Sequence, residues 1–319
     1  MSSYKILISS VSAKVPMIQA VAAGFRQLDS MAEVIGADAD ENCIGKHFVA
    51  DFWHMPLLNN LTIQTLIKYC KSIGITHIIP SRDAELSFYA QYKEPLQEAG
   101  IATMIGNQDT IETCLDKLQF YEQLTDKFPV IKTTLETDTE QQSWVVKERF
   151  GSGSHSLALD VDLQSANNTA SQLQQAVYQP FISGKEYSVD LYFSAMGDCI
   201  GNVVRSRDVI ENGESVKTTS VIDNEISELA IEVGQYLKLY GHNLIQIIKD
   251  GTGKLHIIEV NPRYGGASGL SVALGLKSFY WFGRESAGLC LQGQVLDSYQ
   301  ENKQLIKYKQ ERVIQLNDH

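Results

Sequence analysis

Residues 257–263 read IIEVNPR, and this short stretch decides how the rest of the chain is interpreted. Side chains alternate between two faces along a β-strand, so Glu259 and Asn261 share one face while the apolar residues between them point into the core. A carboxylate beside an amide oxygen is a hard-oxygen site, suited to Mg²⁺ that is shared with substrate phosphates. Pro262 ends the strand and places Arg263 to neutralise a transferring phosphoryl group. Taken alone, the stretch fits a solvated strand end before a turn equally well.

A lysine followed by a loop of small residues lies upstream of this stretch. Residues 145–156 read VVKERFGSGSHS, which puts Lys147 on an apolar strand and a Gly/Ser loop at 151–154. The N–H groups of such a loop can approach phosphates closely, and the lysine adds a point charge. The lysine precedes the glycines, so this is not a Walker A motif. On its own, a Gly/Ser loop is more typical of a hairpin turn.

The first hundred residues alternate between strand and helix patterns. Apolar strand-like segments occur at 5–10, 32–38, 77–80 and 102–105, with helical patterns between them. This alternation predicts a parallel, doubly wound sheet, whose ligands lie beyond the carboxyl ends of the strands. The first strand-to-helix turn, residues 9–13, lacks GxGxxG, so no dinucleotide is assigned here. Asp38 after the second strand fits a turn acid at least as well as a ribose ligand.

From residue 114 onward the pattern is dominated by hairpins and a few amphipathic helices. Residues 250–253 read DGTG, a strong turn signal that predicts pairing of 243–249 with 254–260. The aromatic run 279–282 is interpreted as a helix packed in the core. The remaining expected elements are helices at 116–124, within 162–175 and at 226–239, and strands at 143–148, 156–161, 189–193, 199–204 and, weakly, 313–316.

The bulk composition is that of an ordinary soluble globular protein. The chain has 319 residues, 44% hydrophobic and 20% charged, with a net charge of -11. This acidity argues against general nucleic-acid binding, and no apolar run is long enough to cross a bilayer. The start of the chain lacks the features of a signal peptide. Five cysteines without CxxC spacing argue against disulfides and structural zinc and favour the cytoplasm.

Together with IIPSRDAEL at 78–86 and DKLQFYEQL at 116–124, the two stretches resemble the ATP-grasp superfamily. Within it, the chain is similar to stand-alone proteins related to the large-chain domains of carbamoyl-phosphate synthase. The resemblance covers nearly the whole chain and depends on the order and spacing of the motifs. It implies an α/β and α+β fold: a Rossmann-like pre-ATP-grasp domain over 1–113, a small lobe with its leading helix over 114–178, and a large lobe with the metal site over 179–319.

The resemblance also implies a site for ATP and Mg²⁺, with Mn²⁺ as an alternative metal. Gln179 stands where many relatives place an acid that binds the ribose, and relatives often have Asp or Glu in place of Gln246. The implied catalytic residues are Arg263 and Lys147, and the implied metal ligands are Gln246, Glu259 and Asn261. The implied nucleotide contacts are Lys117, Lys147, Gly151, Ser152, Gly153, Ser154, Gln179, Phe181, Ile182 and Glu186.

The second substrate is expected next to the loop at 264–269, which directly follows the metal strand. Its N–H groups can bind a carboxylate or a tetrahedral intermediate, and the guanidinium groups of Arg205 or Arg207 can fork onto a carboxylate. An exposed basic edge strand explains both arginines equally well. Helix capping by Asp83 is a competing explanation for the loop that carries Arg82. The candidate substrate contacts are Arg82, His155, Arg205, Arg207, Gly266 and Ser268.

The resemblance implies an ATP-dependent carboxylate–amine ligase that forms an acyl phosphate and releases ADP and phosphate. Its expected partners are small-molecule carboxylates and amines, without nucleic acid or membrane, and a homodimer is compatible with the fold. One alternative is phosphorylation of a small carboxylate such as bicarbonate, as in carbamoyl-phosphate synthesis, although those synthases use two grasp units in tandem. Another is a non-catalytic nucleotide-binding protein, although the intact charged residues argue against a decayed site.

Overall fold

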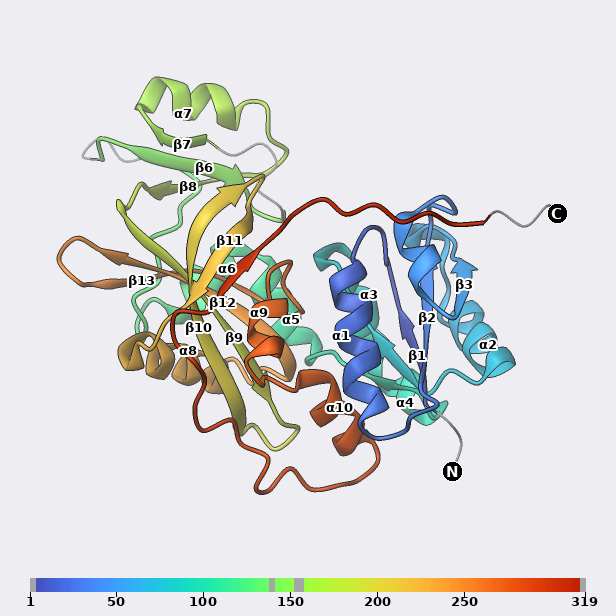
Figure 1. The fold of residues 1–319 in the computed structure, drawn as a ribbon. Helices are drawn as coiled ribbons and strands as arrows, with labels where there is room; N and C mark the ends of the chain where they lie inside the picture. Colours follow the sequence, from blue (N-terminus) through green and yellow to red (C-terminus); the bar gives the residue numbers. More distant parts are fainter. Residues whose placement is uncertain (1–3, 138–140, 152–157, 316–319) are drawn as a thin grey trace.

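The computed structural model describes residues 4–137, 141–151 and 158–315 (Figure 1). Its N-terminal part is the expected parallel sheet, with strand order β3-β2-β1-β4-β5. Four of these strands match the sequence prediction; the edge strand β3 was not expected, because its half-exposed side chains give no apolar run. The strands are β1 (Lys5–Ile8), β2 (Glu33–Asp38), β3 (Asp51–His54), β4 (His77–Ile79) and β5 (Ala102–Thr103).

Helices cover both faces of this sheet, and the alternation of side chains along β1 supplies both cores. Ile6 and Ile8 pack toward α1, whereas Leu7 packs on the opposite face, toward α2 and α3. The carboxyl ends of β1 and β4 point toward the rest of the molecule. The elements are α1 (Val15–Arg26), the 3₁₀ turns η1 (Ile44–Phe48) and η2 (Leu58–Asn60), α2 (Ile63–Ile73), α3 (Asp83–Gln91), α4 (Lys93–Glu98) and α5 (Gln108–Leu115).

A small three-stranded antiparallel sheet, ordered β7-β6-β8, stands apart at one end of the molecule (Figure 1). It consists of β6 (Trp144–Glu148), β7 (Ala158–Val161) and β8 (Ala176–Pro180). The polar stretch after β7 is the expected solvated helix α7 (Leu163–Ala170), which begins where the Asp162 carboxylate accepts the N–H of Ser165. The helix α6 (Lys117–Leu124) precedes this lobe and is capped by Asp116.

The large lobe is a six-stranded antiparallel sheet ordered β13-β12-β9-β10-β11-β14. The expected hairpins at 189–204 and 243–260 are confirmed, as is the amphipathic helix α8 (Asn224–Tyr236). The prediction of a strand at 313–316 was wrong for its described part: residues 313–315 have no regular structure, and the last strand lies at 304–306. The strands are β9 (Gly184–Phe193), β10 (Cys199–Glu211), β11 (Glu214–Ser220), β12 (Gly241–Asp250), β13 (Leu255–Asn261) and β14 (Gln304–Ile306).

The large lobe joins the N-terminal sheet through α10 (Ser278–Ser286), which follows the short helix α9 (Gly269–Ala273). The aromatic run is core, as expected: Phe279, Trp281 and Phe282 are buried. After β14 the chain crosses back to the N-terminal part (Figure 1), where the Arg312 guanidinium donates to the carbonyl of His47 at 3.0 Å. Among the helices of the described ranges, none has the length and apolar character needed to cross a bilayer.

Candidate active site

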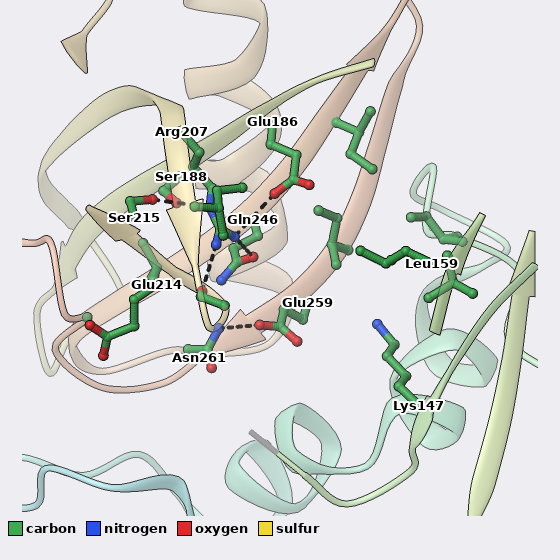
Figure 2. A pocket seen from close by; sticks show the side chains of 18 of the residues that line it. Lys147, Leu159, Glu186, Ser188, Arg207, Glu214, Ser215, Gln246, Glu259 and Asn261 are labelled. Carbon is green, nitrogen blue, oxygen red and sulfur yellow. Dashed lines mark hydrogen bonds and ion pairs between the residues drawn. The ribbon is translucent and has the colours of Figure 1, made fainter. Parts of the chain in front are cut away.

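A cavity of about 520 Å³ lies between the small lobe and the large sheet. One end is apolar and is lined by side chains from both lobes, among them Ile131, Val145, Leu159, Phe181, Ile182 and Ile248. The other end is lined by charged and amide side chains of β6 and β9–β13 and by the loop that follows β13 (Figure 2). An apolar slot leading into a charged end has the character of a nucleotide site.

The predicted metal strand faces this cavity. Glu259 and Asn261 lie on the same face of β13, and the Asn261 amide donates to the Glu259 carboxylate at 2.9 Å. Gln246 lies directly opposite Glu259 in the pairing of β12 with β13, and its side-chain oxygen accepts from the Arg207 guanidinium. In the described ranges, no three His, Cys, Asp or Glu side chains form a metal cage. One carboxylate with amide oxygens fits a divalent cation that takes its remaining ligands from phosphates.

Two lysines face this strand from the opposite wall. Lys147 extends from β6 toward Glu259 (Figure 2), and Lys117 lies at the first turn of α6, where its ammonium donates to the carbonyl of Gly151 at 2.7 Å. Burial lowers the pKa of Lys147 to about 8, although the negative charge of Glu259 opposes this shift. Burial alone would raise the pKa of Glu259, but the positive charges of Lys147 and Lys117 have the larger effect. The pKa of Glu259 therefore lies below its ordinary value. The ammonium groups of Lys147 and Lys117 and the carboxylate of Glu259 are thus opposite charges that face each other across the cavity.

Arg263 connects the charged end to the N-terminal sheet. Its Nε donates to the Asp83 carboxylate of α3 at 2.7 Å, and its Nη2 donates to the same carboxylate. The interpretation of Asp83 as the helix cap was therefore wrong, because this carboxylate is committed to Arg263 and residue 82 is the N-cap. Arg82 is not among the residues that line the cavity, so its predicted substrate contact is not formed here.

Glu85, in the first turn of α3, is buried and accepts hydrogen bonds from the loop before this helix and from the residues after β1. Its carboxylate accepts from the backbone N–H groups of Ser81 and Arg82, at 2.6 and 3.0 Å, and from the hydroxyls of Ser9 and Ser10. The polar loop after β4 is thus held by the carboxyl end of β1. It carries the Asp83 carboxylate toward Arg263 and so fixes the position of the N-terminal part against the cavity.

The two candidate arginines of β10 have different environments. Arg207 lines the cavity, where its guanidinium donates to the carbonyl of Gly213 at 2.7 Å and to Ser215 at 3.2 Å, and lies 3.4 Å from Glu186. Arg205 is only 1% exposed, and its Nε donates to Asp190 at 2.8 Å. Arg205 is also among the residues that line the cavity, but its charge is paired with Asp190, so its contact with a substrate carboxylate stays a prediction.

Asp190 is a buried charged residue behind the cavity wall that the sequence analysis did not single out. It is fully buried, and its carboxylate accepts from Arg205, His242, Ser268 and Ser271. Ser268 is itself buried, and its Oγ also accepts the N–H of Gly265 at 3.0 Å, so its predicted substrate contact is corrected to a role in holding the loop. An aspartate within the apolar segment of β9, residues 189–193, was the available signal.

The remaining predicted nucleotide contacts lie around the apolar end. Phe181, Ile182 and Gly151 line the cavity, as does Glu186. Gln179 also lines it but is only 3% exposed, and its amide nitrogen donates to Thr133 at 2.8 Å. A ribose contact through Gln179 would use its amide oxygen or the second N–H of its amide nitrogen. The predicted contacts at Ser152, Gly153, Ser154 and His155 lie outside the described residues.

Comparison with known proteins shows a family match and a common fold. Residues 114–267 match the ATP-grasp domain family. No curated protein matches the chain significantly. Among solved structures, the biotin carboxylase domain dimer of Hydrogenobacter thermophilus 2-oxoglutarate carboxylase, in complex with MgADP, ADP and bicarbonate, is similar with a TM-score of 0.74 and 15% identity, covering 95% of this chain and 74% of that chain.

Two further solved structures have the same fold. N5-carboxyaminoimidazole synthetase from Staphylococcus aureus, complexed with ADP, gives a TM-score of 0.70 at 17% identity, over 91% of this chain and 79% of that chain. L-amino acid ligase from Bacillus licheniformis gives 0.71 at 15% identity, over 95% and 79%. The segment that matches the family contains Lys117, Lys147, Glu259 and Asn261. Residues 114–267 therefore match the ATP-grasp domain family, and the chain shares its fold with ATP-grasp enzymes of known structure.

Proposed function

We propose that this protein is an ATP-dependent ligase that joins a carboxylate to an amine through an acyl phosphate. The observation that carries the proposal is the opposition of Lys147 and Lys117 to Glu259 and Asn261 across one cavity. ATP brings about four negative charges, and phosphoryl transfer needs positioning and charge neutralisation more than covalent help. The lysine ammonium groups supply fixed positive charge, and the apolar end accepts the adenine ring.

In the proposed reaction, a carboxylate oxygen attacks the γ-phosphorus of ATP, the bond to the β-phosphate oxygen breaks, and ADP leaves. The amine then attacks the acyl carbon, loses a proton, and displaces inorganic phosphate. Lys147 and Lys117 hold the phosphate oxygens, and Arg263 neutralises charge on the side nearest the loop after β13. Glu259 and Asn261 would hold Mg²⁺, with Gln246 as a further ligand, and the metal would supply Lewis-acid neutralisation of the phosphates. Mn²⁺ fits the same oxygen donors.

Similar structures support the nucleotide and the reaction class. One is a biotin carboxylase domain with MgADP and bicarbonate, and another is an L-amino acid ligase. A second candidate is phosphorylation of a small carboxylate alone, which the bicarbonate in the first structure favours.

We also propose domain limits at residues 113 and 178, action in the cytoplasm, and a homodimer; the biotin carboxylase domain was crystallised as a dimer.

The test is phosphate release from ATP and Mg²⁺ across a panel of paired carboxylates and amines. The ligase proposal expects release that requires both partners, is lost in Glu259→Ala, and is kept in Glu33→Ala, a surface glutamate that pairs with Lys5 at 3.5 Å. Release with bicarbonate or another carboxylate alone favours the second candidate. Absence of release with every pair, from a protein that binds ATP, contradicts both enzymatic proposals.

A further inference from the structure

The loop after β13 and the hairpin joining β10 to β11 line one side of the charged end of the cavity. Gly213, Glu214 and Ser215 of the hairpin line the cavity together with residues 265–267. Glu214 is the first residue of β11, and its side chain is 61% exposed. It lies on the far side of Asn261 from Lys147 (Figure 2), away from the phosphate end. This position is where a substrate other than ATP would bind.

The carboxylate of Glu214 lies directly over Gly266. A Cβ added at Gly266 would come within 2.8 Å of one Glu214 oxygen and 3.0 Å of the other. The absence of a side chain at 266 therefore allows this carboxylate to rest against the loop backbone. Among the described residues, no group accepts a hydrogen bond from the N–H of Gly266 or Ala267. The site thus presents a negative carboxylate beside two unused N–H donors.

The C-terminal segment already places an ammonium group at this position. Lys307 follows β14, and its backbone N–H donates to the carbonyl of Val216, which fixes the residue beside β11 at 2.8 Å. Its Nζ donates to the Glu214 carboxylate at 2.5 Å, and its side chain is 30% exposed. An ammonium ion therefore fits against Glu214 at the edge of the cavity. A substrate ammonium would compete with Lys307 for the same oxygens.

We propose that Glu214 and the N–H groups of residues 266–267 form a subsite for an α-amino acid, with the substrate ammonium on Glu214 and its carboxylate on the loop. In an α-amino acid, the ammonium and the carboxylate are separated by one carbon. The ammonium matches the Glu214 carboxylate, and the substrate carboxylate matches the adjacent N–H donors of the loop. The Lys307 ammonium occupies this subsite in the free protein and is displaced by the amino acid. This inference rests on the proposed function, since it names the class of one substrate of the ligase.

The test is calorimetric titration with each of the twenty standard amino acids. Each amino acid that binds is compared with the acid that lacks its amino group, such as propionate for alanine, glutarate for glutamate and 3-phenylpropionate for phenylalanine. At least one amino acid should bind at least about 10-fold more tightly than its analogue without the amino group, because a charge-assisted bond is lost. Glu214→Gln should weaken that binding by about 10-fold or more, whereas Lys307→Met should strengthen it a few-fold by removing the competing ammonium. Lys309→Met, a charge change in the same exposed segment, is the matched control and should leave binding unchanged.

Three binding results would overturn the inference: no amino acid binds the wild-type protein, the analogues without the amino group bind equally well, or Glu214→Gln binds amino acids like the wild type. Thermal unfolding of each variant separates loss of binding from loss of folding. The result is distinguishable from failure of the proposed ligase, because binding is measured without turnover. Phosphate release that requires carboxylates without an ammonium would leave the ligase standing and the subsite refuted.

Discussion

Replacement of Asp190 by asparagine is expected to lower the free energy of unfolding by about 3–5 kcal/mol, because it leaves a buried guanidinium without its counter-ion. Arg205 is 1% exposed and donates to Asp190 at 2.8 Å; its other side-chain contact is Thr218, at 3.4 Å. The hydroxyls of Ser268 and Ser271 also lose a charged acceptor. Urea unfolding followed by tryptophan fluorescence measures the loss.

Two comparison variants give this measurement its control. Glu33→Gln removes an exposed ion pair whose side chains are 35% and 48% exposed, and should cost less than about 1 kcal/mol. The double variant Asp190→Leu with Arg205→Met replaces both charges and should be more stable than Asp190→Asn. A loss below about 1 kcal/mol in Asp190→Asn, or a double variant less stable than the single one, would refute the reasoning.

The same pair predicts a pH dependence. Burial raises the pKa of Asp190, but the charges of Arg205 and His242 outweigh it and hold this pKa below its usual range. A carboxylate with a lowered pKa contributes stability above its unfolded pKa of about 3.9 and loses it as the pH falls toward the folded value. The stability difference between wild type and Asp190→Asn should therefore be constant from about pH 6 to 8 and shrink below about pH 4. A difference that grows on acidification would contradict this sign.

Three further outcomes are expected. Gly266→Ala should push the Glu214 carboxylate away, because the new Cβ would come within 2.8 Å of it. The variant should raise the KM for the second substrate by about 10-fold and leave the KM for ATP unchanged. The control is Gly251→Ala, whose added Cβ would meet nothing within 4 Å. Gly24→Ala should lower the free energy of unfolding in urea by about 1–3 kcal/mol, because the added Cβ would lie 2.7 Å from Phe279 of α10. Equal stability would show that α1 and α10 move apart at little energetic cost. Lys147→Met should weaken ATP binding by about 10-fold or more in calorimetry, and unchanged affinity would remove this lysine from the phosphate site.

Much of the fold follows from local patterns. The DGTG turn and the alternation of side chains on 255–261 predict the strand that carries Glu259 and Asn261, and the structure has it. The parallel sheet follows likewise from strands that alternate with helices. The strands β3, β8, β11 and β14 were not predicted. Three of them lie at sheet edges, which are half solvated and lack a strong apolar pattern, and β11, with the sequence ESVKTTS, is mostly polar.

The candidate site was less predictable, because partners far apart in sequence decide which charges are free. Arg205 and Arg207 lie two residues apart on one strand and both line the cavity, but Arg205 is paired with the buried Asp190 and Arg207 donates to Gln246. Local sequence offers helix capping as one explanation for Asp83, whereas the structure places Arg263, 180 residues away, against its carboxylate. Local spacing carries no information on such contacts. The resemblance groups Glu259, Asn261 and Lys147 at one site, and these three residues line one cavity; their roles there stay predictions.

The proposed reaction requires a divalent cation held between Glu259 and the ATP phosphates. Calorimetric titration of ATP into the wild type and Glu259→Gln, each with Mg²⁺ and with EDTA, tests this directly. We expect Mg²⁺ to tighten binding of ATP to the wild type by about 10-fold or more, and to have little effect on Glu259→Gln, because the bridging carboxylate is gone. Equal dependence on Mg²⁺ in both proteins, or no binding of ATP to the wild type, would contradict the account.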